Sequence, residues 1–423
     1  MNTFAARRFI ASCVVLLATA ATAQAQPFGV ELHNTMMPAS GGMGGVSVAQ
    51  PQDVISAMNA NAASLTGFQG SQYHFGGGWA EATFNLTQTA TLNVPGVTPF
   101  SAKSQTPGAM IGNMGMSRQF SLFDSDANFG IGLISDAGAG VDFRNVPASN
   151  GTSATLLILE MTTSSAVRIT EKLSVGSTFN LGNAYFDGPF VGNSANVSAF
   201  GVRGSLGVNY DVGPATTIGA YWQTKQHFTF QDAIRLELFG GGFDVMRDVQ
   251  MDLPSNIAFG IANRSLMNGN LLLAMDVLYK QWDQCDLFEA VYRNQWVFQF
   301  GAQYSFRKLR LRAGYVFAEN PLKPIPLPTV GGVPLQGAQN AAEYLQATLA
   351  SINQNRISAG VGVVNALPGV DLDFNVGGML KESEQLGPFT SVNMESYWIG
   401  LGMTYRYGAH QSGYTSPLAR DGS

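Results

Sequence analysis

Residues 295–306 read QWVFQFGAQYSF, and residues 309–317 read LRLRAGYVF. In both stretches every second residue is apolar, while the positions between them are mostly Gln, Arg, Gly and Ser. Alternation with a period of two predicts a β-strand with one apolar and one polar face. Arg307 and Lys308 alone separate the two strands, which indicates a tight hairpin between antiparallel neighbours.

The same alternation recurs along the chain and predicts fourteen strands. Their expected ranges are 73–86, 108–119, 127–143, 154–169, 172–187, 196–210, 215–231, 248–264, 269–283, 294–306, 308–319, 355–365, 369–383 and 394–407. Short and long links mostly alternate between these ranges, as turns and external loops do in transmembrane barrels. Several strands are long and end in Tyr or Trp, which favours a closed barrel over a β-sandwich. The expected fold is all-β, an antiparallel transmembrane β-barrel of fourteen strands.

Composition excludes several other classes of protein. Asp, Glu, Lys and Arg make up 12% of the 423 residues, against about 25% in ordinary soluble domains. Glycine is enriched, with 49 residues, while the apolar share of 45% is ordinary. A highly charged disordered chain and a soluble enzyme both fit these values poorly. After residue 25 no apolar run reaches the length of about 18 residues that a membrane-spanning helix needs.

The first 25 residues have the features of a secretory signal peptide. Arg7 and Arg8 precede an apolar run at residues 9–21, and small residues at expected cleavage positions follow. Removal of this segment leaves 21 basic and 28 acidic residues, a net charge of −7 that disfavours nucleic acid as a partner. It also leaves Cys285 as the single cysteine, which cannot form an intrachain disulfide.

Residues 26–72 lie between the signal peptide and the first strand. They are rich in small residues, with the run GGMGG at residues 41–45, and they are too apolar for a solvated tail. A barrel of about fourteen strands has a lumen wider than its own side chains fill. We therefore expect residues 26–72 to form a hatch inside the lumen. Residues 73–407 would form the barrel, and residues 408–423 a polar tail.

This layout resembles the FadL/TodX family of outer-membrane transporters for hydrophobic compounds, over nearly the whole mature chain. The hatch of that family carries a glycine-rich stretch, then an Asp, then an Asn-Pro-Ala motif before the first strand. The corresponding positions here are residues 41–45, Asp53, and the triplet Asn61, Ala62 and Ala63. Two features depart from the pattern: Ala62 replaces the proline, and a polar tail replaces a terminal aromatic residue. The resemblance implies a multi-pass monomer in a Gram-negative outer membrane, inserted by the barrel assembly machinery.

The third strand of that family is kinked inward and opens a gap in the barrel wall. Residues 129–140, FGIGLISDAGAG, resemble that strand. Gly138 and Gly140 fit a break in pairing, because glycine inside a strand often marks a bulge or bend. An ordinary crowded strand is the alternative. The residues expected to form the lateral opening are Ser135, Asp136, Ala137, Gly138, Ala139 and Gly140.

The resemblance implies passive, gated uptake of long-chain fatty acids or other hydrophobic molecules, among them alkanes and aromatic hydrocarbons. Cargo would be captured at apolar external loops and released sideways into outer-membrane lipid. The expected contacts are Leu238, Phe239 and Phe243 in the loop 232–247, Phe28, Leu32, Met36 and Met37 in the hatch, and Arg312 in the lumen. Each has a structural alternative: the apolar residues pack on their neighbours, and the arginine pairs with a luminal acid. Residues 336–352 carry an apolar helical stripe, for which packing within the loop is expected.

Rival functions predict different observations. A general or polar-solute porin needs an open, water-filled pore, which a hatch of this length would obstruct. A structural or adhesive barrel would leave uptake unchanged on deletion. Four histidines, His33, His74, His227 and His410, are scattered without metal-ligand spacing, and no G-x-S-x-G motif is present. We therefore expect no enzyme activity, no cofactor and no metal, and the residues leave the choice between fatty-acid and hydrocarbon cargo open.

Overall fold

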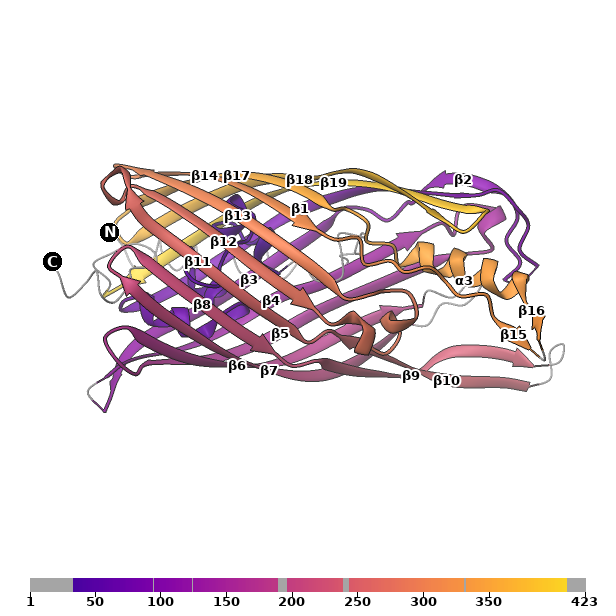
Figure 1. The fold of residues 1–423 in the computed structure, drawn as a ribbon, viewed down its shortest axis with the longest axis horizontal. Coiled ribbons are helices and arrows are strands. Elements are labelled where there is room, and N and C mark those ends of the chain that lie inside the picture. Colours follow the sequence, from indigo (N-terminus) through magenta and orange to yellow (C-terminus); the bar gives the residue numbers. More distant parts are fainter. Residues whose placement is uncertain are drawn as a thin grey trace, which may run out of the picture.

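The computed structural model describes residues 33–408, apart from positions 94, 124, 189–195, 239–242 and 331. The expected signal peptide and nearly all of the expected polar tail lie outside the described residues. Fourteen antiparallel strands form one closed ring, which confirms the prediction from alternation (Figure 1). Register pairs from Ser71–Tyr407 to Gln88–Thr390 join the first strand to the last. The ring therefore closes on itself, with its first strand paired to its last.

Each strand of the ring pairs with its neighbours along the chain. In chain order the strands are β1 (Ser71–Gln88), β3 (Ala109–Leu122), β4 (Ser125–Asp142), β5 (Ser153–Arg168), β6 (Leu173–Asp187), β7 (Asn196–Gly213), β8 (Thr216–Gln223), β11 (Asn256–Leu266), β12 (Leu271–Lys280), β13 (Gln295–Phe306), β14 (Leu309–Ala318), β17 (Asn355–Leu367), β18 (Val370–Leu386) and β19 (Thr390–Tyr407). Short turns connect them at one end of the ring, called here the turn end. Longer segments connect them at the opposite, loop end, except for the short link 387–389 between β18 and β19 (Figure 1).

The predicted strands 215–231 and 248–264 each divide in two toward the loop end. β8 is followed by β9 (Gln226–Leu238), and β10 (Phe243–Leu253) precedes β11, with Pro254 between them. Proline has no backbone N–H to donate, so it interrupts the ladder at this point. Within the described chain β9 and β10 pair with each other alone, as a hairpin that extends beyond the ring (Figure 1).

The other elements of the loop end are short. β2 (Phe100–Lys103) pairs with β1, and β15 (Thr329–Val330) pairs with β16 (Val333–Pro334). The helix expected in the longest loop is present as α3 (Gln336–Thr348), and its buried Tyr344 packs against the apolar core. The 3-10 helices outside the lumen are η4 (Pro147–Ser149), η5 (Met267–Gly269), η6 (Trp282–Gln284) and η7 (Phe288–Ala290). No helix among the described residues is long and apolar enough to span a membrane.

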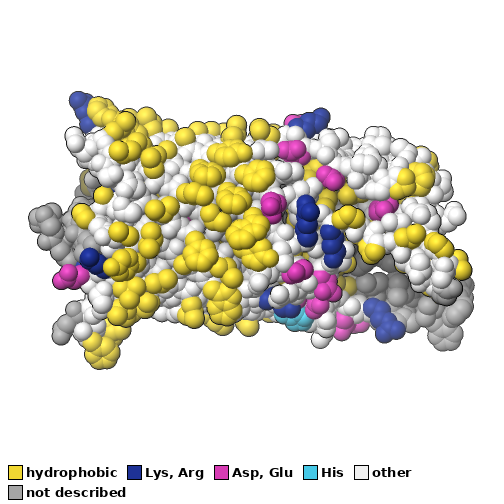
Figure 2. All heavy atoms as spheres, in the orientation of Figure 1, with side chains coloured by type: hydrophobic (Ala, Val, Ile, Leu, Met, Phe, Trp, Pro, Cys, Tyr) yellow, Lys and Arg dark blue, Asp and Glu magenta, His cyan; other side chains and the backbone are white. Residues whose placement is uncertain are grey.

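The outer face of the ring is apolar. Phe200 and Leu401, for example, are 70% and 67% exposed on it. Soluble monomers rarely expose so many large apolar side chains in one continuous surface. Figure 2 shows such side chains over most of the visible wall, with most charged side chains gathered toward the loop end. Tyr279 and Trp296 lie at the rim near the loop end, with ring centroids 4.6 Å apart. This distribution is typical of a barrel whose wall contacts lipid.

Residues 33–68, called here the luminal segment, lie inside the ring toward its turn end (Figure 1). The segment contains η1 (His33–Met36), η2 (Ser40–Met43), α2 (Val54–Asn59) and η3 (Ala62–Gly67). Nearly all of its residues are buried, and it touches all fourteen strands of the ring. Asp53 caps α2 by accepting a hydrogen bond of 2.7 Å from the Ser56 N–H. The segment lies where the sequence predicts a hatch, whose first residues are outside the described range.

Glycines on the inner face of the strands make room for this segment. At each of these positions an added Cβ would collide with atoms of the luminal segment. The glycines, called here the glycine ring, are Gly76, Gly176, Gly207, Gly219, Gly260, Gly301, Gly314, Gly360 and Gly402. Gly314 is the most crowded, because a Cβ there would overlap the backbone of Met43 and Gly44. Part of the glycine excess of the sequence therefore lies where strand and luminal segment meet.

Candidate functional site

Between the luminal segment and the loop end, the lumen is filled by apolar side chains from strand ends and loops. We call the whole apolar group the external cluster. Its aromatic members are Phe84, Phe143, Phe186, Phe228, Phe230, Trp282, Phe288, Tyr292 and Tyr344. Phe186 stacks on Phe230 with ring centroids 4.9 Å apart, and Trp282 packs edge-on against Tyr292 at 5.3 Å. A porin for polar solutes has a polar interior here. This part of the lumen instead suits apolar molecules.

The inner faces of the strands change character along their length. In β1 the inner face begins with Gln72 and His74, passes Gly76, and is apolar at Phe84 and Leu86, ahead of the terminal Gln88. Strict alternation hides this change, because a scan for period two assigns one face of each strand as polar throughout. A sequence signal does exist: residues 156–159 of β5 read LLIL, and such a run indicates a strand that is buried on both faces.

The wall of the ring is interrupted between β3 and β4. Register pairs join these strands up to Asn113–Ile134, and the next backbone hydrogen bond between the two segments runs from the Gln105 N–H to the Asp142 carbonyl, at 2.8 Å. Residues 135–142 of β4 remain paired with β5, and residues 109–112 of β3 remain paired with β1. The two stretches therefore face each other without ladder hydrogen bonds. We call this part of the wall the window.

A β-bulge lies in β4 at the start of the window. The register against β5 shifts between Ser135 and Ala137, so Asp136 is the extra residue. Its carboxylate accepts a hydrogen bond of 2.7 Å from Arg203, which also lies 3.3 Å from Glu160. All three charged side chains are buried, and Arg203 is the shared partner that balances the two carboxylates.

The six residues expected to form a lateral opening, 135–140, all border the window. The bulge falls at Asp136 rather than at Gly138 or Gly140, which pair regularly with β5. The ion pair accounts for the difference, because Arg203 holds the Asp136 side chain in the lumen. Whether cargo passes through the window stays a prediction at this point.

Apolar side chains approach the window from inside the lumen. On the β4 side, Ala137 packs against the external cluster. On the β3 side lies a second group, called here the wall cluster, which consists of Ala80, Ala82, Ala109, Met379 and Trp398, with Met36 and Ile111 packed against it. An apolar surface therefore leads from the loop end to the window on both of its sides.

The methionines predicted as hatch contacts lie in different surroundings. Met36 is partly buried against the wall cluster, where it would be available to a molecule near the window. Met37 is 2% exposed and packs with Ile55 and Met58 of the luminal segment, which corresponds to the structural alternative. The other two predicted residues of the hatch, Phe28 and Leu32, lie outside the described residues.

The predicted capture loop is a hairpin rather than an irregular loop. Leu238 and Phe243 form the last register pair between β9 and β10, and Phe239 lies outside the described residues. Inward-facing residues nearer the base of this hairpin, among them Phe228 and Met251, belong to the external cluster. The hairpin therefore contributes to the apolar lumen, while a capture role for its tip stays a prediction.

Two luminal arginines differ in their partners. Arg312 is fully buried, forms an ion pair with Asp373 and donates a hydrogen bond of 2.8 Å to Gln303, as the structural alternative predicts. Arg356 is 7% exposed and lies beside Met379 on the inner face of β17. No described carboxylate pairs with Arg356. Its guanidinium is thus better suited than that of Arg312 to receive an anionic head group.

The triplet at residues 61–63 fixes the end of the luminal segment. The side-chain amide of Asn61 donates to the Val48 carbonyl at 2.9 Å and to Asn209 Oδ1 at 2.7 Å, and its oxygen accepts from the Ala63 N–H. Asn61 therefore caps η3 and ties it to β7. Ala62 is the first residue of η3, a position where proline is common because its φ is preset. The cap supplies order there without the proline.

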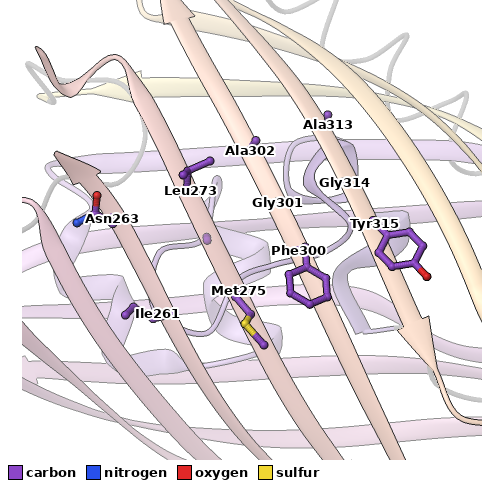
Figure 3. Close-up of a pocket in the computed structure, with 11 residues that line it drawn as sticks. Ile261, Asn263, Leu273, Met275, Phe300, Gly301, Ala302, Ala313, Gly314 and Tyr315 are labelled. Atoms are coloured by element: carbon purple, nitrogen blue, oxygen red, sulfur yellow. The ribbon is translucent and has the colours of Figure 1, made fainter. Parts of the chain in front are cut away.

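A depression of about 600 Å³ is lined by residues of β11, β12, β13 and β14 (Figure 3). Its margin is formed by side chains such as Leu273, Phe300 and Tyr315, which are 39–42% exposed. Its floor is formed by the small residues Gly301, Ala302, Ala313 and Gly314. The depression belongs to the apolar outer wall and is separate from the external cluster.

Comparison with known proteins adds to this description of a fourteen-stranded barrel whose lumen holds residues 33–68. The sequence matches no family model and no curated protein. The structure is similar to that of the Pseudomonas putida toluene transporter TodX, with a TM-score of 0.65 and 16% identity over 90% of this chain and 100% of that chain. It is also similar to the Ralstonia pickettii toluene transporter TbuX, with a TM-score of 0.62 and 18% identity over 89% of this chain and 99% of that chain. A Pseudomonas aeruginosa FadL homologue is similar too, with a TM-score of 0.61 and 14% identity over 91% of this chain and 100% of that chain. The chain therefore has the FadL/TodX fold, as the sequence resemblance predicts.

Proposed function

We propose that this protein is an outer-membrane channel for the passive, gated uptake of hydrophobic molecules, such as long-chain fatty acids or hydrocarbons. The observation that carries the proposal is the external cluster, which fills the lumen on the loop side of the luminal segment. A polar solute loses hydrogen bonds with water in such surroundings. An apolar solute gains roughly 25 cal/mol for each Å² of apolar surface removed from water. Transporters for toluene share the fold, which supports the same class of cargo.

We propose further that cargo leaves the barrel sideways through the window. The luminal segment obstructs the axial path, since it touches every strand and its backbone is held by the ring. The buried carboxylate of Asp276 accepts hydrogen bonds of 2.6 and 2.9 Å from the N–H groups of Ser47 and Val48. Apolar side chains of the external and wall clusters approach the window from the lumen, which supports an exit from there into the lipid. A hydrophobic molecule is more soluble there than in the periplasm.

Uptake by whole cells tests the proposed function. Cells that produce the protein are expected to accumulate labelled toluene or labelled oleate faster than cells from which it is deleted. Purified protein in planar bilayers is expected to show little steady ion conductance, because the luminal segment and the external cluster exclude water. Unchanged uptake of both compounds together with a large, steady conductance would instead identify a porin for polar solutes.

Replacement of Arg356 by Met is expected to separate the two classes of cargo. A hydrogen bond between a buried guanidinium and a carboxylate contributes about 1.5–3 kcal/mol, so oleate uptake should fall about tenfold or more. Toluene has no charge and should enter at the rate of the unmodified protein. Arg356→Lys keeps the positive charge and should retain part of the oleate uptake. An equal loss for oleate and toluene would assign Arg356 a structural role instead.

A further inference from the structure

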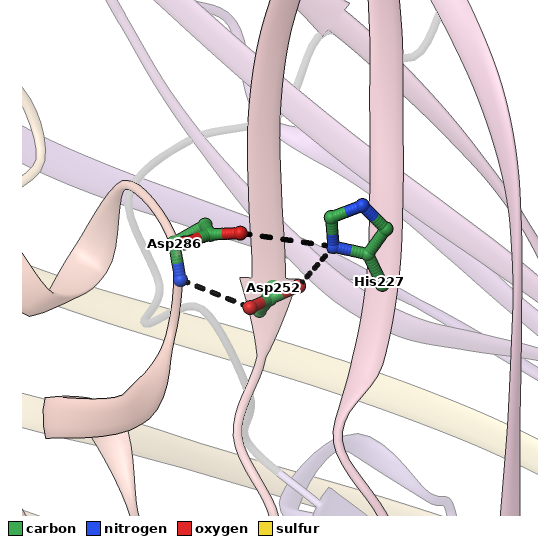
Figure 4. A group of neighbouring side chains, drawn as sticks. All are labelled: His227, Asp252 and Asp286. Carbon is green, nitrogen blue, oxygen red and sulfur yellow. Dashed lines mark hydrogen bonds and ion pairs between the residues drawn. The ribbon is translucent and has the colours of Figure 1, made fainter.

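Three side chains with metal-ligating atoms converge at the loop end: His227 of β9, Asp252 of β10, and Asp286 between η6 and η7 (Figure 4). Their ligand atoms all lie within 4.8 Å of one another. His227 Nδ1 is 2.6 Å from Asp252 Oδ1 and 3.9 Å from Asp286 Oδ2. Tetrahedral coordination with bonds of about 2.0–2.2 Å places ligand atoms about 3.4 Å apart. Small shifts of exposed side chains would therefore bring all three onto one ion.

Neighbouring groups orient these side chains. The second oxygen of Asp252 accepts hydrogen bonds from the Asp286 N–H at 3.0 Å and from Lys225 Nζ at 2.7 Å, which leaves the first oxygen facing His227. Thr229 Oγ1 lies 3.1 Å from His227 Nε2, so a proton on Nε2 can be donated to it. That tautomer directs the lone pair of Nδ1 toward the two carboxylates. Hydrogen bonds that orient the ligating side chains in this way are typical of metal sites.

We propose that His227, Asp252 and Asp286 bind one divalent transition-metal ion such as Zn²⁺, with water in the remaining position. An imidazole and two carboxylates form a ligand set that suits such ions. The Asp252 carboxylate is fully buried, whereas His227 and Asp286 are 46% and 43% exposed, so the site has a rigid base and an open entrance. Within the described chain, the Asp286 carboxylate accepts no hydrogen bond that would compete with the ion.

The ion would fasten together two parts of the apolar lumen. Phe228 and Leu253, next to the ligands of β9 and β10, belong to the external cluster, as do Trp282 and Phe288 on either side of Asp286. A bound ion would therefore join the β9–β10 hairpin to the loop that carries η6 and η7. This consequence for gating rests on the proposed function, whereas binding of the ion can be measured without it.

Titration of the purified full-length protein in detergent with Zn²⁺, followed by calorimetry, tests the proposal. We expect one ion per chain, and Co²⁺ at the same site should give the visible absorption of a bound ion. His227→Gln and Asp286→Asn should each weaken binding about 10–100-fold or more, since each removes a ligand. The exposed Asp283, which bonds Asn294 in the same loop, provides the matched control. Asp283→Asn should bind Zn²⁺ like the unmodified protein.

Lys225 supplies a test in the opposite direction. Its ammonium lies 2.7 Å from Asp252 Oδ2, and its positive charge opposes a cation nearby. Lys225→Met should therefore bind Zn²⁺ more tightly than the unmodified protein. Absence of saturable binding in the unmodified protein, or equal binding by Asp286→Asn and Asp283→Asn, would overturn the proposal. Neither result would bear on uptake, so failure here and failure of the proposed function are distinguishable.

Discussion

Deletion of Asp136 is expected to abolish uptake of hydrophobic cargo while the barrel still folds. Without this residue, Ser135 and Ala137 become consecutive and continue the regular register against β5 that they flank now. A regular β4 would run beside residues 109–112 of β3, whose edge toward the window is unpaired, and would close the window with ladder hydrogen bonds. We expect uptake to fall by more than tenfold, which corresponds to a rise in the barrier of over about 1.4 kcal/mol.

The matched control for this deletion is Asp136→Asn. It keeps the number of residues in β4 and an oxygen that can accept the Arg203 hydrogen bond, and it removes one of the two carboxylate charges that Arg203 contacts. Uptake by Asp136→Asn should stay within about twofold of the unmodified protein, less than about 0.5 kcal/mol in the barrier. Heat-sensitive migration on gels verifies that both variants fold. Normal uptake by a folded deletion variant would contradict the lateral exit.

Gly314→Leu is expected to displace the luminal segment and convert the protein into a conducting pore. A Cβ at residue 314 would overlap the backbone of Met43 and Gly44, which cannot move aside as a flexible side chain can. Overpacking of this kind costs about 1–3 kcal/mol or more. The neighbouring glycines Gly301 and Gly360 already contact Met43 and Gly42, so the backbone of the luminal segment cannot shift toward them. Planar bilayers should show a large, steady conductance for this variant.

Gly213→Leu serves as the control for that substitution. Gly213 lies at the turn end of β7, and a Cβ added there would have no atom within 4 Å apart from those of its immediate chain neighbours. Both variants replace glycine by leucine, but only the leucine at position 314 faces the luminal segment. We expect Gly213→Leu to keep the low conductance of the unmodified protein. Equal, low conductance in both variants, with both barrels folded, would contradict a tightly seated luminal segment.

The strands were predictable because half of their residues face lipid. In β13 and β14, outward residues such as Phe300 and Tyr315 must be apolar, and this requirement produces the alternation seen in the sequence. The interruption between β10 and β11 could also have been expected from Pro254, which cannot donate to a ladder. The predicted strand 248–264 nevertheless spans Pro254, because apolar residues alternate in the same phase on both sides of the proline.

The luminal site could not be assembled from the sequence. Members of the external cluster come from strands and loops as distant as Phe84 and Met394, and their proximity depends on closure of the ring. The bulge at Asp136 likewise depends on Arg203, which lies outside the strands that pair with β4. The histidines lack metal-ligand spacing in the sequence for the same reason, since His227 meets its carboxylates through folding. The expectation of no metal rested on sequence spacing, which cannot detect ligands that only folding brings together.

The seam between β1 and β19 has a consequence for biogenesis. It joins Ser71 to Tyr407, so it can form only when almost the entire chain has been synthesised and delivered. Contacts between such distant residues form slowly, and until then both terminal strands present unpaired edges. The luminal segment directly precedes β1 and is enclosed by every strand, so its seating and the sealing of the ring are a single late event. We therefore expect substitutions in the glycine ring to act at this late step, by leaving the luminal segment unseated when the ring is sealed.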